Sequence, residues 1–449
     1  MRNKRVAVDM DRISYMPELI QSHIVSFLPL KQTIRTSILS RRWRDICSCL
    51  SNLDFDQLIG VVEEKNVKDI IDHTLFLIKG ANLKRVMLDV EIDPNHISSV
   101  HFNRWVSFAL GHNVKVLVIK LYVEELVFLP RSLFIGSCLT GLELSGFSLK
   151  LPTVASFPVL KILGLISMTF LDEYLTNKLF SDSSCPMLES LEMVNCYLDN
   201  FTTLSISATN LKYLHILFDT DEIPINFNLS NPNLEYIFYV NNSLPEISLE
   251  TLSSLRTATF EICLPPTSSL VRENLACKIL LGMHNVNLLT LMGHFIQFLT
   301  RVPDLLACVP TSYCCLKSLW FGLDRTKHQL KVMTLLLRSY PNLQKLCVSF
   351  REEDVTTPDM ICMDENWQSK DLPSGDVLKH LTTVRIDDIR GSESEVDFVT
   401  YLLENAIILE EMKILFLRRK EITVETQMRV CQKLLTVARV STRARIFLS

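Results

Sequence analysis

The chain has 449 residues, of which 48% are hydrophobic and 21% are charged, a composition typical of packed rather than disordered proteins. The formal net charge of −4 includes no domain-scale basic excess, which disfavours nucleic acid as the main partner. No uninterrupted apolar run of about 18 residues occurs, and the first ten residues lack a signal-peptide core, so we expect no membrane association.

Thirteen cysteines are scattered from Cys47 to Cys431 without a Cys-x-x-Cys pair. Neither metal-ligand spacing nor a disulfide framework fits this pattern. We therefore predict free thiols that act as small core hydrophobes in a reducing compartment, which favours a cytoplasmic or nuclear location.

Residues 11–53 show the apolar spacing of three short helices. Pro17 fits the first turn of the first helix, and Pro29 is predicted to end that helix. Ser40 is a candidate N-cap for the third helix. The apolar positions predicted for the three helices in turn are Leu19, Ile20, Ile24, Phe27 and Leu28, then Ile34, Ile38 and Leu39, then Trp43 and Ile46. So small a unit buries little surface, which leaves open whether it docks a partner or packs on the next domain.

The segments 11–14, 16–17, 24–29 and 36–44 read DRIS, MP, IVSFLP and TSILSRRWR, and they resemble the F-box of plant F-box/leucine-rich-repeat proteins. Met16 stands where leucine is usual in that family, a swap that conserves volume. The resemblance implies a module that binds a Skp-family adaptor and, through it, a cullin. By resemblance, the candidates for the adaptor-facing or module-core positions are Pro17, Ile24, Leu28, Pro29, Ile34, Leu39 and Trp43.

From residue 50 onward, an apolar-x-x-apolar-x-apolar triplet recurs, mostly at the period of leucine-rich repeats. The last two positions of each triplet point to one face of a strand, so stacked strands form a continuous core. The triplets are Leu50/Leu53/Phe55, Leu83/Val86/Leu88, Val114/Leu117/Ile119, Leu139/Leu142/Leu144, Leu160/Leu163/Leu165, Leu188/Leu191/Met193, Leu211/Leu214/Ile216, Leu234/Ile237/Tyr239, Leu255/Ala258/Phe260, Val286/Leu289/Leu291, Leu316/Leu319/Phe321, Leu343/Leu346/Val348, Leu381/Val384/Ile386 and Leu409/Met412/Ile414.

Four of these triplets follow a proline, at Pro158, Pro186, Pro232 and Pro341. Because proline disfavours a helical residue before it, we expect an extended approach to each strand. Between strands, the spacing predicts a helix at the end of residues 266–283 and another over 330–339. The polar stretch 351–376 is a candidate linker or insertion.

The last eighty residues are predicted to form a strand, a turn at Gly391, a helix capped by Ser394 and a second strand. A helix over 424–437 is expected to close the chain. This region resembles the FBD module of plant F-box/leucine-rich-repeat proteins, and a cap on the last repeat explains it structurally.

Sequence motifs of enzymes, such as phosphate-binding loops, zinc-binding helices and nucleophile elbows, do not occur. The ten histidines are isolated, and Asp387 and Asp388 are strand neighbours that would point to opposite faces. We therefore expect no catalytic residue, cofactor or metal.

Residues between the core positions should line the concave face of the repeats. In two adjacent units these include Tyr213 and His215, then Tyr236 and Phe238, a concentration of aromatic side chains typical of an interface. The hypothesis is that these four residues contact a substrate protein. The alternative is that a loop over 219–230 covers them.

The predicted fold class is α/β, with a three-helix F-box, a leucine-rich-repeat solenoid of parallel strands with outer helices or loops, and an FBD-type cap. The expected boundaries are 9–55 for the F-box, 56–350 for the repeats, 351–366 for a linker and 367–449 for the FBD-like module. The predicted function is that of a non-catalytic substrate-recognition subunit of an SCF-type ubiquitin ligase. A repeat scaffold outside any ligase and an enzyme with an unrecognised site are the alternatives.

Overall fold

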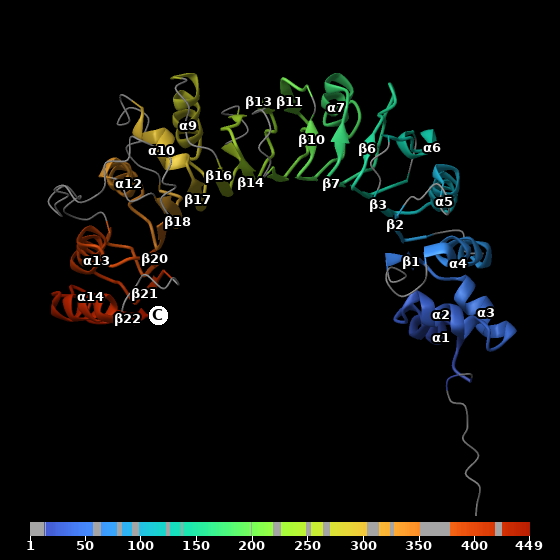
Figure 1. The fold of residues 1–449 in the computed structure, drawn as a ribbon, viewed down its shortest axis with the longest axis horizontal. Helices are drawn as coiled ribbons and strands as arrows, with labels where there is room; N and C mark the ends of the chain where they lie inside the picture. The colour runs from blue at the N-terminus through green and yellow to red at the C-terminus, as the bar shows by residue number, and fades with distance from the viewer. Residues whose placement is uncertain are drawn as a thin grey trace, which may run out of the picture. The chain divides into compact units, whose positions relative to one another are not determined.

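The computed structural model describes residues 13, 15–56, 64–78, 83–91, 98–122, 126–135, 138–198, 200–218, 226–247, 253–263, 270–302, 314–323, 327–350, 378–417 and 424–449. The chain divides into two compact units, Met1–Leu188 with Cys196–Asn200, and Glu189–Asn195 with Phe201–Ser449. Within each unit the strands form a main parallel sheet and a second, small sheet, and the helices between the repeat strands lie on one side of the main sheet (Figure 1).

The first unit begins with three helices and continues with parallel strands in the order β1-β2-β3-β5-β7. A second, smaller sheet has the order β10-β8-β6-β4. The elements of this unit are α1 (Glu18–Ser26), α2 (Leu30–Ser37), α3 (Arg41–Ser48), β1 (Asn52–Asp54), α4 (Glu64–Leu77), β2 (Arg85–Glu91), α5 (Ser99–Gly111), β3 (Val116–Tyr122), β4 (Leu126–Val127), α6 (Arg131–Phe134), β5 (Gly141–Ser145), β6 (Ser148–Leu149), β7 (Ile162–Ile166), β8 (Thr169–Phe170), α7 (Glu173–Leu179) and β10 (Tyr197–Leu198).

The second unit has parallel strands in the order β9-β12-β14-β16-β17-β18-β19-β20-β21-β22, with a second sheet β11-β13-β15. Its elements are β9 (Ser190–Val194), β11 (Thr203–Ile206), β12 (Tyr213–Leu217), β13 (Asn226–Leu229), β14 (Tyr236–Asn241), β15 (Glu246–Ile247), β16 (Thr257–Ile262), α9 (Leu270–Gly282), β17 (Leu288–Gly293), α10 (Phe295–Thr300), β18 (Ser318–Leu323), α12 (Lys327–Ser339), β19 (Lys345–Phe350), β20 (Thr383–Ile389), α13 (Glu393–Asn405), β21 (Glu411–Phe416), α14 (Val424–Thr436) and β22 (Arg445–Leu448).

The predicted repeat register is confirmed in both units. The middle positions of successive triplets pair directly, as Leu214 does with Ile237 and Ile237 with Ala258. Every triplet residue is buried except Leu50, which is half-buried. The regular burial extends beyond residue 260, so the triplets from Val286 to Ile414 are repeats of the same kind.

The four prolines act differently from the prediction, because each lies in a tight turn rather than an extended segment. The amide of Leu160 donates to Phe157 O at 3.3 Å, and the amide of Leu234 donates to Asn231 O at 3.1 Å. Proline therefore occupies the second position of a β-turn, where its fixed φ is already correct. Asn233 follows one such proline and donates from Nδ2 to Thr209 O of the preceding repeat at 2.9 Å.

The predicted helix near residue 394 is present, but Ser392 caps it and Ser394 does not. Ser392 Oγ accepts from the amide of Glu395, and Glu395 Oε2 accepts from the amides of Arg390, Gly391 and Ser392 at 3.1, 2.8 and 2.9 Å. Gly391 has a φ of +82°, and a Cβ there would lie 2.8 Å from Val430 Cγ2. The turn thus needs glycine both for its backbone conformation and for the close approach of α14.

The predicted helix over 424–437 is confirmed as α14, but it is not the last element, because β22 follows it and pairs with β21. Arg443 stands three residues before Ile446, where the other repeats have an apolar residue, so the triplet pattern is broken there. No helix was expected over Glu64–Leu77 or Ser99–Gly111, where α4 and α5 lie. The candidate linker 351–376 lies outside the described residues.

Candidate functional site

The residue before each of the three N-terminal helices determines where that helix begins. Pro17 and Pro29 are the N-caps of α1 and α2, with φ values of −55° and −52°. Pro29 therefore starts the second helix, whereas α1 already ends at Ser26. As predicted, Ser40 caps α3, and its Oγ accepts from the amide of Trp43 at 3.2 Å.

A small core holds these helices together. Val25, Ile46 and Cys47 are buried against one another, and Trp43 and Leu50 pack on them. Burial raises the pKa of the Cys47 thiol to about 11, so it stays protonated, and its Sγ lies 3.4 Å from Thr33 O. Cys47 is therefore a core hydrophobe, as the sequence predicted.

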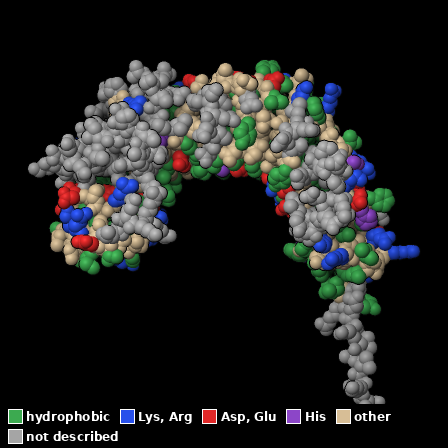
Figure 2. All heavy atoms as spheres, in the orientation of Figure 1, with side chains coloured by type: hydrophobic (Ala, Val, Ile, Leu, Met, Phe, Trp, Pro, Cys, Tyr) green, Lys and Arg blue, Asp and Glu red, His purple; other side chains and the backbone are tan. Residues whose placement is uncertain are grey.

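Most of the apolar face predicted for α1 is exposed rather than buried. Leu19 is 86% exposed and Phe27 is 74% exposed, and in the turn after α2 Leu39 is 73% exposed. Figure 2 shows hydrophobic and basic side chains together on the surface of this module. Exposed apolar side chains gathered on so small a unit are typical of a binding surface.

The predicted adaptor-binding residues fall into two groups in the structure. Pro17, Leu28, Pro29 and Leu39 are exposed, so they are available to a partner. Ile24, Ile34 and Trp43 are half-buried, and Trp43 packs on the core cluster. Ile38, which the spacing placed on the second helix, was not among the candidates chosen by resemblance, yet it is also exposed. Spacing defines a helical face without showing what covers that face.

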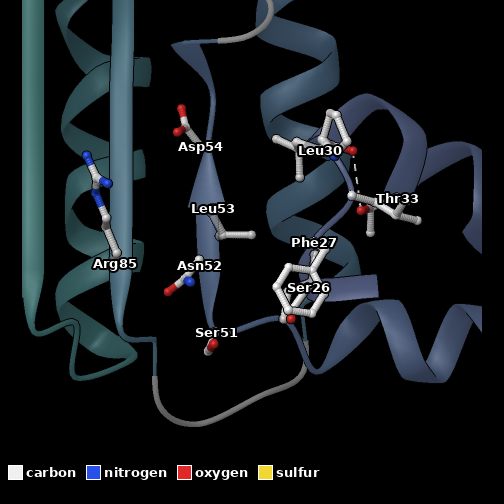
Figure 3. A pocket seen from close by; sticks show the side chains of 12 residues that line it. Ser26, Phe27, Leu30, Thr33, Ser51, Asn52, Leu53, Asp54 and Arg85 are labelled. Atoms are coloured by element: carbon white, nitrogen blue, oxygen red, sulfur yellow. Dashed lines mark hydrogen bonds between the residues drawn. The ribbon is translucent and has the colours of Figure 1, made fainter. Parts of the chain in front are cut away.

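A pocket of about 280 Å³ lies between the helical module and the first strands. Figure 3 shows Phe27 and Leu30 on the helical side and Leu53 of β1 pointing toward them, whereas Asn52 and Asp54 point toward Arg85. Strand β1 thus joins the module to the repeat core, since Leu53 is fully buried and pairs with Val86 of β2.

The predicted substrate-binding residues come together on the sheet face opposite the helices. Tyr213 pairs with Tyr236 and His215 pairs with Phe238 across β12 and β14. The Tyr213 and Tyr236 ring centroids are 6.4 Å apart, and His215 meets Phe238 edge to face at 4.6 Å. These side chains form an aromatic patch, in which Tyr213 is 50% exposed and the other three are half-buried.

Glu192, which the apolar spacing did not single out, extends the aromatic patch onto β9. His215 Nδ1 lies 3.0 Å from Glu192 Oε1, and both side chains are partly exposed. A shallow depression of about 270 Å³ lies here, and its lining is Ser190, Leu191, Glu192, Tyr213, Leu214, His215 and Tyr236. The triplet register could have identified Glu192, because this residue occupies in β9 the position that His215 occupies in β12.

The described part of the segment 219–230 does not cover the aromatic patch. Phe227 of β13 packs edge to face on Tyr239, at 5.5 Å between ring centroids. Tyr239 is buried and neighbours Phe238 along β14, so the two side chains point to opposite faces of the sheet. Strand β13 therefore lies on the core side, and residues 219–225 lie outside the described residues.

Among the described residues, no group of three or more His, Cys, Asp or Glu side chains could hold a metal ion. Within the same residues, no helix combines the length and apolarity needed to cross a membrane. The expectation of free thiols is wrong for Cys277, which is disulfide-bonded, whereas ten other cysteines among the described residues form no disulfide. Burial raises the pKa of Cys185 to about 12, as expected of a core thiol.

Three short helices followed by a parallel sheet with a repeating buried triplet define a leucine-rich-repeat protein with an N-terminal helical module. Comparison with protein families matches the F-box domain to residues 13–58 and the At1g61320/AtMIF1 leucine-rich-repeat domain to residues 77–446. The chain therefore belongs to the At1g61320/AtMIF1 leucine-rich-repeat family and carries an F-box, as the resemblance implied.

Similar proteins of Arabidopsis thaliana carry both the F-box and the leucine-rich repeat in their names. F-box/LRR-repeat protein 13 is 24% identical over 98% of this chain and 96% of its own length. F-box/LRR-repeat protein At1g06630 is 28% identical over 75% of this chain and 84% of its own length. F-box/FBD/LRR-repeat protein At1g78750 is 25% identical over 90% of this chain and 89% of its own length.

Proposed function

We propose that the chain is a substrate receptor of an SCF-type cullin–RING ubiquitin ligase, working in the cytoplasm, the nucleus or both. The F-box binds a Skp-family adaptor, and the repeats hold a target protein. The observation that carries this proposal is the exposed apolar surface of the F-box, formed by Leu19, Phe27, Ile38 and Leu39. Exposed Arg35, Arg41 and Arg44 on α2 and α3 favour an acidic partner surface beside it.

In this proposal the chain supplies no catalytic group. The receptor holds a target close to a ubiquitin-conjugating enzyme and so raises the effective concentration of the target's lysines. The boundaries proposed are those expected from the sequence, including an FBD-type cap over 367–449. The cap is supported by the name of the relative F-box/FBD/LRR-repeat protein At1g78750.

The test is the binding of the full-length chain to a purified Skp-family adaptor. We expect Leu39→Asp to abolish stable binding, because a carboxylate would be desolvated in an apolar interface. Phe76→Asp is the matched control, since Phe76 is 84% exposed on α4, outside the F-box. Failure of the unmodified chain to bind any adaptor of this family would refute the ligase assignment and leave the alternative of a repeat scaffold.

The aromatic patch is the proposed substrate-binding surface. Replacing Tyr236 and Phe238 with Ala should reduce target capture without unfolding the chain, because both side chains lie on the outer face of β14. Target capture is measured with an adaptor-bound receptor, so that loss of adaptor binding is not mistaken for loss of the target. Unchanged capture would rule out the patch.

A further inference from the structure

We propose that the depression beside the aromatic patch binds a lysine or arginine side chain of an extended peptide segment in the target protein. This inference rests on the proposed function and specifies the chemistry of the target. The depression joins two tyrosine rings, Tyr213 and Tyr236, with the carboxylate of Glu192. Aromatic ring faces and a carboxylate attract the same ligand, an organic cation.

The geometry leaves these groups available. Tyr213 is half exposed, and its ring is tilted by 41° from that of Tyr236 rather than stacked on it. Glu192 Oε1 accepts one hydrogen bond, from His215 Nδ1, and the Glu192 side chain remains 46% exposed. Since an ionised carboxylate can accept about four hydrogen bonds, Glu192 retains capacity for a cationic donor. His215 acts as a positioning residue, because its edge-to-face contact with Phe238 fixes its ring.

The charge of the surrounding sheet face favours the same ligand. The outward positions of β9, β12, β14, β16, β17 and β18 include Glu192 and Glu261, and none of these described positions has a Lys or Arg. Basic side chains appear on this face from β19 onward, where Lys345, Arg385 and Lys413 lie. Arg385 and Lys413 already pair with Asp387 and Glu411 at 2.9 and 2.8 Å.

An extended segment fits this face better than a folded surface does. The depression is shallow and spans three adjacent strands, so a single long side chain can enter it while the peptide backbone lies across the outward positions. The neighbouring outward residues Thr257, Thr259 and Thr290 offer hydroxyl groups for such a backbone. An acidic segment or a nucleic acid would meet Glu192 and Glu261 without a compensating basic side chain from these strands.

The test begins with a random peptide library displayed on phage and selected on the full-length chain bound to its adaptor. We expect the enriched peptides to share one Lys or Arg position. The best of them, labelled with fluorescein, then serves as the probe. Replacing its basic residue with Gln should weaken binding roughly tenfold, the combined effect of a lost cation–π contact and a lost ion pair.

Variants of the receptor identify the residues responsible. Glu192→Gln should weaken probe binding by roughly five- to tenfold, whereas Glu261→Gln, the same change on the same face outside the depression, should have little effect. Tyr236→Leu keeps apolar bulk but removes the ring face, so it should weaken binding, while Tyr236→Phe should not. Thermal unfolding of each variant confirms that it is folded.

Several results would overturn the inference. These are enriched peptides without a shared basic residue, absence of enrichment, and equal probe affinity for the Glu192→Gln variant and the unmodified chain. If the adaptor binds but no basic peptide is selected, the inference fails and the proposed ligase role stands. If the isolated chain selects basic peptides but binds no adaptor, the ligase role fails and the inference stands.

Discussion

Leu39 and Trp43 lie four residues apart in the F-box, yet the structure predicts opposite consequences for their loss. Leu39 is 73% exposed, whereas Trp43 packs on the core cluster of Val25, Ile46 and Cys47. Full burial of a leucine side chain contributes about 1.5–3 kcal/mol, so roughly 1–2 kcal/mol remains to be gained when an adaptor covers Leu39. Leu39→Ala should therefore weaken adaptor binding about 5- to 30-fold.

The same substitution should leave the fold unchanged, because exposed positions usually alter the free energy of unfolding by less than about 0.5 kcal/mol. Trp43→Ala should destabilise the F-box by about 2 kcal/mol, roughly half the cost of truncating a fully buried aromatic residue. The assays are adaptor affinity by calorimetry and hydrogen exchange of α3 by mass spectrometry, both on the full-length chain. Unchanged affinity for Leu39→Ala, or unchanged exchange for Trp43→Ala, would refute this division of roles.

Two further predictions concern the C-terminal turn and the buried thiols. Glu395→Ala removes the acceptor of three backbone amides and should lower the free energy of unfolding by about 3 kcal/mol. The control, Glu393→Ala at an exposed position of the same helix, should change the unfolding midpoint little. Equal midpoints for the two variants would contradict the role of Glu395. In thiol labelling at pH 8, exposed Cys138 should react and Cys185 should not until the chain unfolds, because its raised pKa suppresses the thiolate; early labelling of Cys185, detected by mass spectrometry, would contradict its burial.

Most of the repeat architecture could be predicted from the sequence because burial alone fixes the strand register. A shift of one residue would turn Leu214 and Ile216 outward, so the apolar spacing specifies both the strand and its inner face. Strand β22 was not predicted, because the prediction depends on a pattern of buried residues. It is the last strand of its sheet, its residues are largely exposed, and its sequence therefore has no need for the full apolar triplet.

Details that depend on neighbours in space could not be predicted from spacing. Ser392 and Ser394 are both reasonable caps by residue type, and the choice depends on Glu395 reaching back to the amide of Ser392. The four residues of the aromatic patch were correctly placed on one face, but their pairing with Glu192 requires the alignment of β9 with β12. That alignment follows from the triplets once the strands are known to be adjacent and parallel.

The separation of inward and outward positions also shows that the fold does not require the aromatic patch. The inward residues Leu214 and Ile237 hold the register of β12 and β14 whatever lies on the other face. Neighbouring strands have Ser190 and Thr257 at the outward position that Tyr213 and Tyr236 occupy, so small polar side chains satisfy the fold there. A tyrosine side chain at this outward position adds nothing to the buried core. It also leaves part of its apolar ring surface in water. This contrast supports the proposed role of the aromatic patch in binding.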